Sequence, residues 1–116
     1  MTISIHMQSA FQDYDFFKKN MDEILEQQSG ITKCLYGRST PEKFANKYFE
    51  NTQVICENPH LSNFKTQNLY KSVENSDLTI FFYRSDRKVG SDLTKKTISR
   101  AKNLEKQFIV IEYEKD

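Results

Sequence analysis

Short β-rich runs and helical stripes alternate along the whole chain, and this alternation constrains the fold more than any other feature. The expected strands are 2–7, 31–36, 53–56, 76–83 and 108–111. Between them, apolar residues recur with the period of an amphipathic helix. A strict β-α-β-α-β-α-β-α-β order predicts a parallel sheet with helices on both faces. We therefore expect an α/β fold, a single Rossmann-like three-layer domain over residues 1–116 with a mostly parallel five-stranded sheet.

The change from strand to helix is clearest after the first β-rich run. Thr2 to Met7 alternates apolar and polar residues, as a strand does. From Asp13 onward the period changes, and Phe17, Met21 and Ile24 fall on one helical stripe. Asp13 is a typical helix N-cap, and such a segment is expected to cover one face of the sheet.

Length, charge and cysteine content restrict the class of protein. The chain has 116 residues, enough for one core, and a net charge of +1, so bulk electrostatics does not explain its function. Cys34 and Cys56 lack metal-site spacing and are expected to be reduced core residues. No run approaches the roughly 20 apolar residues of a membrane span. We expect a cytoplasmic protein without a metal or other cofactor.

The last forty residues indicate a binding site for an anion. The run 76–83 is followed by a basic loop, then Gly90–Ser91, then a helical pattern. Residues 84–106 contain eight basic and three acidic side chains, a local charge of +5. A helix that begins just after a strand presents free N–H groups and a positive dipole end. Phosphate is the commonest biological anion that binds at such a helix end.

Ligands of open parallel sheets bind at the carboxyl ends of strands where the strand order reverses. If the first and fourth strands are central neighbours, the site lies between Gln8–Ser9 and the 83–91 loop, flanked by residues 37–39. Glycine allows close approach of the backbone, and arginine offers a fork of donors to phosphate. The predicted ligand-binding residues are Gln8, Ser9, Gly37, Arg38, Ser39, Tyr83, Arg84, Gly90, Ser91 and Thr94.

Several of these residues also have an ordinary structural interpretation. Gly37 is equally explained as a turn and Ser39 as a helix cap, and neither a P-loop nor the dinucleotide-binding glycine pattern is present. His6 lies in a strand and is expected to be a buried, hydrogen-bonded histidine. The aromatic residues at strand ends and in loops fit either base stacking or the rim of the core. These are Phe11, Tyr36, Phe64 and Tyr83.

The order of motifs resembles the Rossmann-like SLOG superfamily, which includes DNA-processing and cytokinin-activating proteins. Phe11-Gln12-Asp13-Tyr14 is similar to the entry of the family's first long helix. Ser76 to Phe82, then Gly90-Ser91 with Thr94, is similar to its closing strand and phosphate-contacting turn. The similarity spans nearly the whole chain, although each motif is degenerate. It is closest to the short bacterial and phage members of the superfamily.

Departures from the family pattern limit what the resemblance implies. The first turn reads Met7-Gln8-Ser9, without the family's glycine and arginine, and Thr97 rather than Thr94 has the family spacing to Ala101. The signature that carries the catalytic glutamate of the phosphoribohydrolase members is absent. The resemblance therefore implies a nucleotide pocket more strongly than an enzyme. The chain is rich in Lys, Asn, Phe, Tyr and Ile, a composition typical of AT-rich coding in many phages. Because SLOG-like domains of bacterial defence systems sense nucleotide signals, the resemblance implies a phage protein that sequesters such a signal.

Two other functions stay open at this point. An enzyme cleaving an N-glycosidic or phosphate bond would need a general acid or base, for which Asp86, Glu57 and His60 are the candidates. A small protein that modifies a host protein by docking is the other alternative. We expect a homo-oligomer, and neither a membrane nor duplex nucleic acid as partner, since no continuous basic face or recognition helix is apparent.

Overall fold

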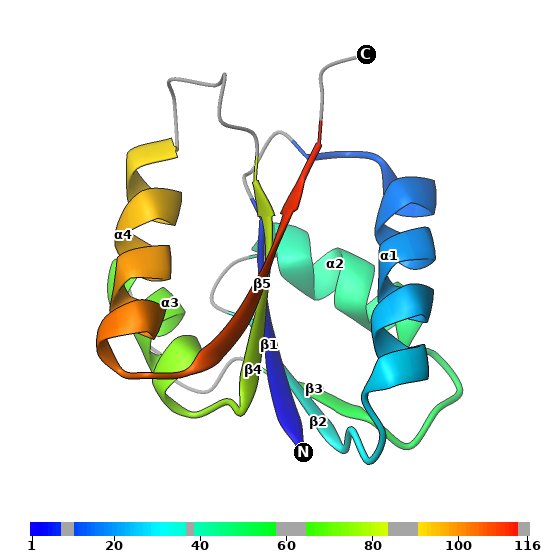
Figure 1. Cartoon of the computed structure of the whole chain (residues 1–116). Coiled ribbons are helices and arrows are strands. Elements are labelled where there is room, and N and C mark those ends of the chain that lie inside the picture. The colour runs from blue at the N-terminus through cyan, green and yellow to red at the C-terminus, as the bar shows by residue number, and fades with distance from the viewer. Residues whose placement is uncertain (8–10, 37–38, 58–64, 84–90, 114–116) are drawn as a thin grey trace.

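The computed structural model describes residues 1–7, 11–36, 39–57, 65–83 and 91–113, with the backbone alone for 39–42, 65–69 and 91–93. Strands and helices alternate from the first element to the last, as the sequence predicts (Figure 1). The elements are β1 (Thr2–Met7), α1 (Tyr14–Gln27), β2 (Lys33–Tyr36), α2 (Ser39–Tyr48), β3 (Ile55–Glu57), α3 (Lys65–Glu74), β4 (Leu78–Tyr83), α4 (Ser91–Asn103) and β5 (Gln107–Glu112).

All five strands are parallel and lie in the order β3-β2-β1-β4-β5. β1 is central, with Ile5 opposite Tyr36 of β2 on one side and opposite Ile80 of β4 on the other. The expected α/β class and five-stranded sheet are therefore confirmed, and the sheet is wholly rather than mostly parallel.

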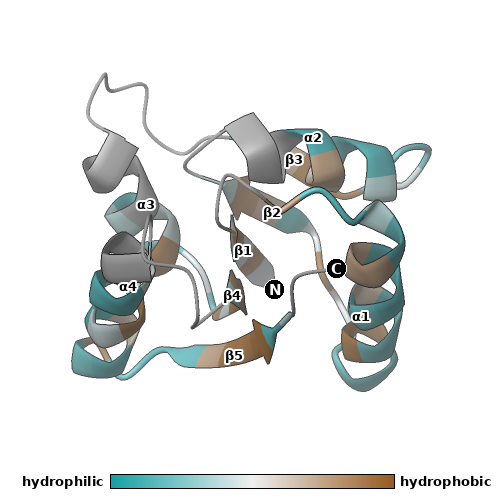
Figure 2. Cartoon of the chain, turned by 90° about the horizontal axis from the view of Figure 1, so that it is seen from above, coloured by the Kyte–Doolittle hydropathy of each residue, from teal (hydrophilic) through white to brown (hydrophobic). Residues whose placement is uncertain are grey.

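The helices form two outer layers around the sheet. α1 and α2 cover one face, and α3 and α4 cover the other (Figure 2). This arrangement follows from right-handed crossovers, because the chain first moves from β1 toward β3 and then returns across β1 to β4 and β5. We refer to the two sides of the sheet as the α1/α2 face and the α3/α4 face.

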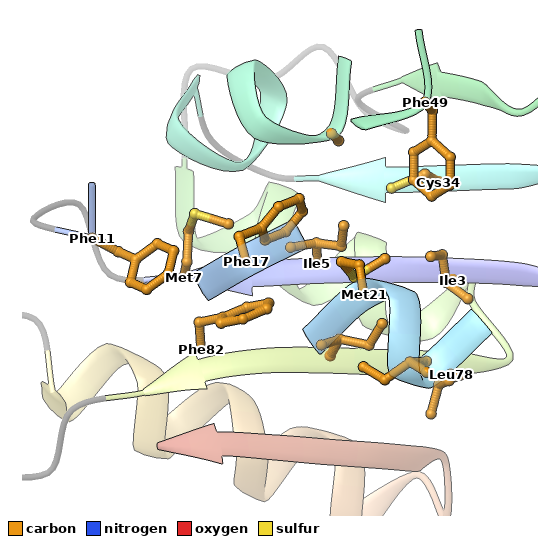
Figure 3. Packing of buried hydrophobic residues seen from close by; sticks show 13 residues of the cluster. Ile3, Ile5, Met7, Phe11, Phe17, Met21, Cys34, Phe49, Leu78 and Phe82 are labelled. Carbon is orange, nitrogen blue, oxygen red and sulfur yellow. The ribbon is translucent and has the colours of Figure 1, made fainter. Parts of the chain in front are cut away.

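Apolar side chains fill the α1/α2 face. Alternation in β1 directs Ile3, Ile5 and Met7 to this side, and β4 contributes Leu78, Ile80 and Phe82. The helical stripe of α1 packs against them through Phe17, Met21 and Ile24, as expected (Figure 3). Phe17 is fully buried and its ring lies 5.2 Å from that of Phe82, centroid to centroid.

The α3/α4 face is more polar at the same strands. Ser4 and His6 of β1 and Thr79 of β4 are all buried there, between strand residues that face the other side. Its apolar cluster is small among the described side chains: Val73, Phe81 and Ala101, with Ile98 and Phe108 packed against it. The two faces of one sheet thus bury different kinds of side chain.

Local signals position the elements close to where they were expected. The Asp13 carboxylate accepts a hydrogen bond from the Phe16 backbone N–H at 3.1 Å and caps α1. Gly30, after α1, has a φ of 78°, which suits glycine. The expected fourth strand begins later than predicted: Asp77 lies outside β4, where its carboxylate accepts from Thr2 N at 2.8 Å.

None of the helices in the described part of the chain is both long enough and apolar enough to span a membrane.

Candidate functional site

The reversal of strand order falls between β1 and β4. These strands are direct neighbours, with Met7 opposite Phe82 near their carboxyl ends. The chain moves from β1 to β2 on one side, and β4 lies on the other side. The condition on which the predicted site depends is therefore met, and the edge where β1 and β4 end is the candidate site.

Two helices begin after strands that end at this edge. α2 begins at Ser39 after β2 ends at Tyr36, and α4 begins at Ser91 after β4 ends at Tyr83. With 10 and 13 residues, both helices have first-turn N–H groups without a partner inside the helix. α4 follows β4, the strand beside the central β1, so its first turn is the helix opening that lies at the reversal point (Figure 1).

Most of the predicted ligand-binding residues lie outside the described part of the chain: Gln8, Ser9, Gly37, Arg38, Arg84 and Gly90. Ser39 and Ser91 are described by their backbone as the first residues of α2 and α4. The structure thus locates the two helix openings that were predicted. Of the ten predicted ligand-binding residues, only Tyr83 and Thr94 have side chains that the structure describes.

Tyr83 ends β4 and is almost buried, with 8% of its surface exposed. Its backbone carbonyl accepts a hydrogen bond from Tyr113 N at 3.1 Å. By strand alternation its side chain lies on the α3/α4 face with Phe81. Tyr83 therefore lies at the predicted edge, and its ring is packed within the protein there.

Thr94 lies in the first turn of α4 and is directed into the protein. It is 1% exposed, and its hydroxyl lies 3.0 Å from His6 Nε2 in a buried hydrogen bond. The His6 ring in turn lies 5.5 Å from that of Phe81, in a tilted arrangement. The prediction of a buried, hydrogen-bonded His6 is confirmed. The Thr94 hydroxyl joins the opening of α4 to β1, which suits a positioning role better than direct contact with a ligand.

The inward side of α4 is made of small and polar residues. Thr94, Thr97 and Ala101 are buried at positions three and four apart, and so lie on one helical stripe. Small side chains allow the helix to lie close to β4 and β5. Thr94 and Thr97, the two threonines that follow the predicted phosphate-contacting turn, are therefore both buried.

A buried hydroxyl cluster lies further down the same face. Ser4 Oγ is 2.7 Å from Thr79 Oγ1 and 3.1 Å from Ser76 Oγ, and the Ser76 hydroxyl donates to the Val73 carbonyl at 3.1 Å. These hydroxyls bond to one another and to the backbone. The cluster therefore reads as a structural link between β1, β4 and the end of α3.

The aromatic residues near the edge are core residues rather than open stacking surfaces. Phe11 is 2% exposed, and its ring packs edge-on against Tyr113 at 4.7 Å and near Phe82 at 5.3 Å. Tyr36 is also buried, at 7% exposed. Of the two interpretations, base stacking and the rim of the core, the structure favours the rim of the core for these residues. Phe64 lies outside the described residues.

The residues considered for acid or base catalysis are only partly described. Glu57, the last residue of β3, forms an ion pair with Lys33 at 2.8 Å, and both side chains are about two-fifths exposed. Asp86 and His60 lie outside the described residues. Among the residues that are described, there is no group of three or more side chains suited to hold a metal ion.

Two open grooves on the helices lie away from the predicted residues. One, of about 630 Å³, runs between α1 and the end of α2. In it the Tyr48 hydroxyl donates to Asp22 at 2.6 Å, and this bond and Lys18 lower the pKa of Asp22. The other, of about 350 Å³, is lined by Tyr70 of α3 and by basic residues of α4. Neither includes any of the ten residues predicted to bind the ligand.

Comparison with known proteins gives no further constraint. No family model, no curated protein and no solved structure matches this chain. The fold itself is Rossmann-like in its parallel five-stranded α/β architecture. Function is therefore inferred from the site alone.

Proposed function

We propose that this protein binds a nucleotide or a nucleotide-derived signal, with a phosphate at the opening of α4. The observation that carries the proposal is the reversal of strand order between β1 and β4, with α4 beginning after β4 at the same edge. Open parallel sheets bind ligands at this position, and a helix N-terminus favours an anion.

The buried contacts beneath α4 support a site whose parts are held in place. The His6–Thr94 hydrogen bond fixes the first turn of α4 to the central strand. Thr97 and Ala101 continue the contact toward the sheet. A helix end held in this way offers its N–H groups to an anion without reordering, which lowers the entropic cost of binding.

Two arginines that lie next to these elements in the sequence are the proposed charged groups of the site. Arg84 directly follows Tyr83, the last residue of β4, and Arg38 precedes the first residue of α2. Arginine pairs with phosphate through two parallel hydrogen bonds. We propose these two residues as the charged partners of the phosphate, with Gln8 and Ser9, which follow β1 in sequence, contributing polar contacts.

Calorimetry with AMP, ADP, cyclic AMP and ADP-ribose tests the proposal directly. We expect at least one of them to bind at micromolar affinity or tighter. Arg84→Ala should weaken that binding by about 1–3 kcal/mol, the scale of a charge-assisted hydrogen bond. This corresponds to roughly 5- to 150-fold in Kd.

Arg100→Ala is the matched control, because it removes the same charge from the far end of the same helix. Arg100 lies in the last turn of α4 and forms an ion pair with Glu74 of α3. We expect the Kd of Arg100→Ala to stay within a factor of about two of the original value. Absence of binding across the panel, or equal losses in both variants, would overturn the proposal.

We further propose that it is a SLOG-like protein of phage origin that sequesters a nucleotide signal of host defence. This assignment rests on the motif order and on the missing catalytic glutamate, as described above. Sequestration requires that bound nucleotide be recovered unchanged. Chromatography after incubation tests this, and a released base or phosphate would show the enzyme alternative instead. Native mass spectrometry tests the expected homo-oligomer and any retained small molecule together.

A further inference from the structure

The two cysteines of the chain face each other across neighbouring strands. Cys34 of β2 and Cys56 of β3 are 22 positions apart in sequence and are direct Cα partners in the parallel ladder. Register partners point to the same face of a sheet. Both lie on the α1/α2 face: Cys34 packs in the core beside Phe49 (Figure 3), and the Cys56 thiol donates to the Ala45 carbonyl of α2 at 3.7 Å.

The spacing of these strands is compatible with a covalent link. Neighbouring strands lie about 4.8 Å apart. Disulfides join cysteines whose Cα atoms are about 4.4–6.8 Å apart. β3 has three residues and pairs with β2 alone, at the edge of the sheet. A short edge strand adjusts more readily than a central one, which favours closure of the bond.

The two thiols differ in exposure and acidity. Cys34 is fully buried, whereas Cys56 is partly exposed. A hydrogen bond with Cys56, together with burial, raises the pKa of Cys34. The same hydrogen bond lowers the pKa of Cys56. Cys56 is therefore the more acidic and the more accessible thiol of the two.

We propose that Cys34 and Cys56 form a redox pair in which Cys56 reacts with a peroxide and Cys34 resolves the product to a disulfide between β2 and β3. In the first step the Cys56 thiolate attacks a peroxide oxygen, the O–O bond breaks, and Cys56 sulfenic acid and hydroxide form. In the second step Cys34 sulfur attacks the Cys56 sulfur and the sulfenic hydroxyl leaves with the Cys34 proton as water. The peroxide is reduced by two electrons, and the two thiols are oxidised.

The link would close the segment from β2 through α2 to β3. It would join the edge strand covalently to the sheet, and a thiol reductant would reverse it. This inference does not depend on the nucleotide proposal, because it uses neither the β1/β4 edge nor α4. Failure of either proposal leaves the other intact.

Intact-mass spectrometry of the folded chain with hydrogen peroxide tests the pair. Remaining thiols are blocked with N-ethylmaleimide after each time point. We expect the chain to lose two hydrogens and both reactive thiols together, and a reductant to restore them. Peptide mapping should find the Cys34 and Cys56 peptides joined by a disulfide within a single chain.

Single variants separate the two roles. In Cys34→Ser, Cys56 should remain as a sulfenic acid that dimedone traps; Cys34→Ala gives the same readout if the serine variant folds poorly. In Cys56→Ser, Cys34 should resist peroxide at the same concentration. The proposal is wrong if the unaltered chain accumulates sulfinic acid at Cys56 with Cys34 still reduced, or forms disulfides only between chains.

Discussion

The two faces of the sheet are built from the same strands and are nonetheless unlike. On the α1/α2 face, β1 contributes Ile3, Ile5 and Met7 to a cluster of large apolar and aromatic side chains. On the α3/α4 face, the intervening residues Ser4 and His6 are buried in hydrogen bonds. The first face gains stability from area removed from water, whereas the second gains positional specificity from paired polar groups.

This difference separates the parts of the molecule that hold it together from those that position the proposed site. The helix that opens the site, α4, rests on the polar face and is joined to β1 through Thr94. The helix that supplies the largest described apolar stripe, α1, lies on the opposite face with Phe17 and Met21. Substitutions on the two faces should therefore have different consequences.

The largest expected effect is on the α1/α2 face. Phe17→Ala should lower the free energy of unfolding by about 3–5 kcal/mol, because it leaves a cavity among Tyr14, Phe44, Tyr48 and Phe82. Urea denaturation followed by circular dichroism measures it.

The matched substitution on the other face is Phe108→Ala. Phe108 is only partly buried against its cluster, so the same change should cost less than half as much. Equal costs for the two phenylalanines would break the comparison between the faces.

An intermediate effect is expected in the hydroxyl cluster. Thr79→Val keeps the side-chain shape but removes the partner of the Ser4 hydroxyl at 2.7 Å. We expect a loss of about 1–2 kcal/mol in the free energy of unfolding, since a buried hydroxyl loses its best partner. Denaturant unfolding of the single variant gives this number.

A double variant sharpens that test. Ser4→Ala with Thr79→Val should cost less than the sum of the single variants, because Ser76 keeps its bond to the Val73 carbonyl and no hydroxyl of the pair is left behind. Strict additivity would show that the polar face is not a coupled network.

The smallest effect is on the outer surface of the α3/α4 face. A hydrogen bond from Arg100, aided by Lys71, holds the pKa of Glu74 below its ordinary value of 4.5. A depressed folded pKa stabilises the protein above the ordinary value, and this contribution is lost as pH falls through the folded pKa. Because both side chains are partly exposed to solvent, we expect less than about 1 kcal/mol at pH 7.

Unfolding of Glu74→Gln across pH measures that contribution. The difference from the unaltered chain should be present at neutral pH and vanish in acid. Glu23→Gln, on the exposed side of α1, removes the same charge as a control. A difference for Glu74→Gln that persists unchanged into acid would contradict the ion-pair account.

Local patterns were sufficient to predict much of this fold. The alternation of Ile3, Ser4 and Ile5 predicts β1, and the stripe with Asp13 as N-cap predicts α1, because both depend on neighbours in sequence. The parallel order follows from the strict alternation of elements. The observed ends of the elements differ from the predicted ones where contacts distant in sequence determine them. Asp77 was expected within a strand, but it lies before β4, and its carboxylate accepts a hydrogen bond from the Thr2 backbone N–H.

The contacts of the candidate site depend on pairing that no local pattern reveals. His6 and Thr94 are 88 positions apart, and Ser4 and Thr79 are 75 apart. The facing of Cys34 and Cys56 depends on the register of β2 with β3. Thr94 was predicted at the ligand because it follows Gly90–Ser91 in sequence, and that spacing gives no sign of its hydrogen bond to His6.

The most direct test of the central claim is an NMR titration of backbone amides with whichever panel nucleotide binds best in calorimetry. The account predicts saturable shifts at Tyr83 and in the first turn of α4 from Ser91 to Thr94, at the edge where β1 and β4 end. Amides around Asn103 at the other end of α4 should stay unchanged. Saturable shifts confined to the α1/α2 groove, or none at the α4 opening, would contradict it.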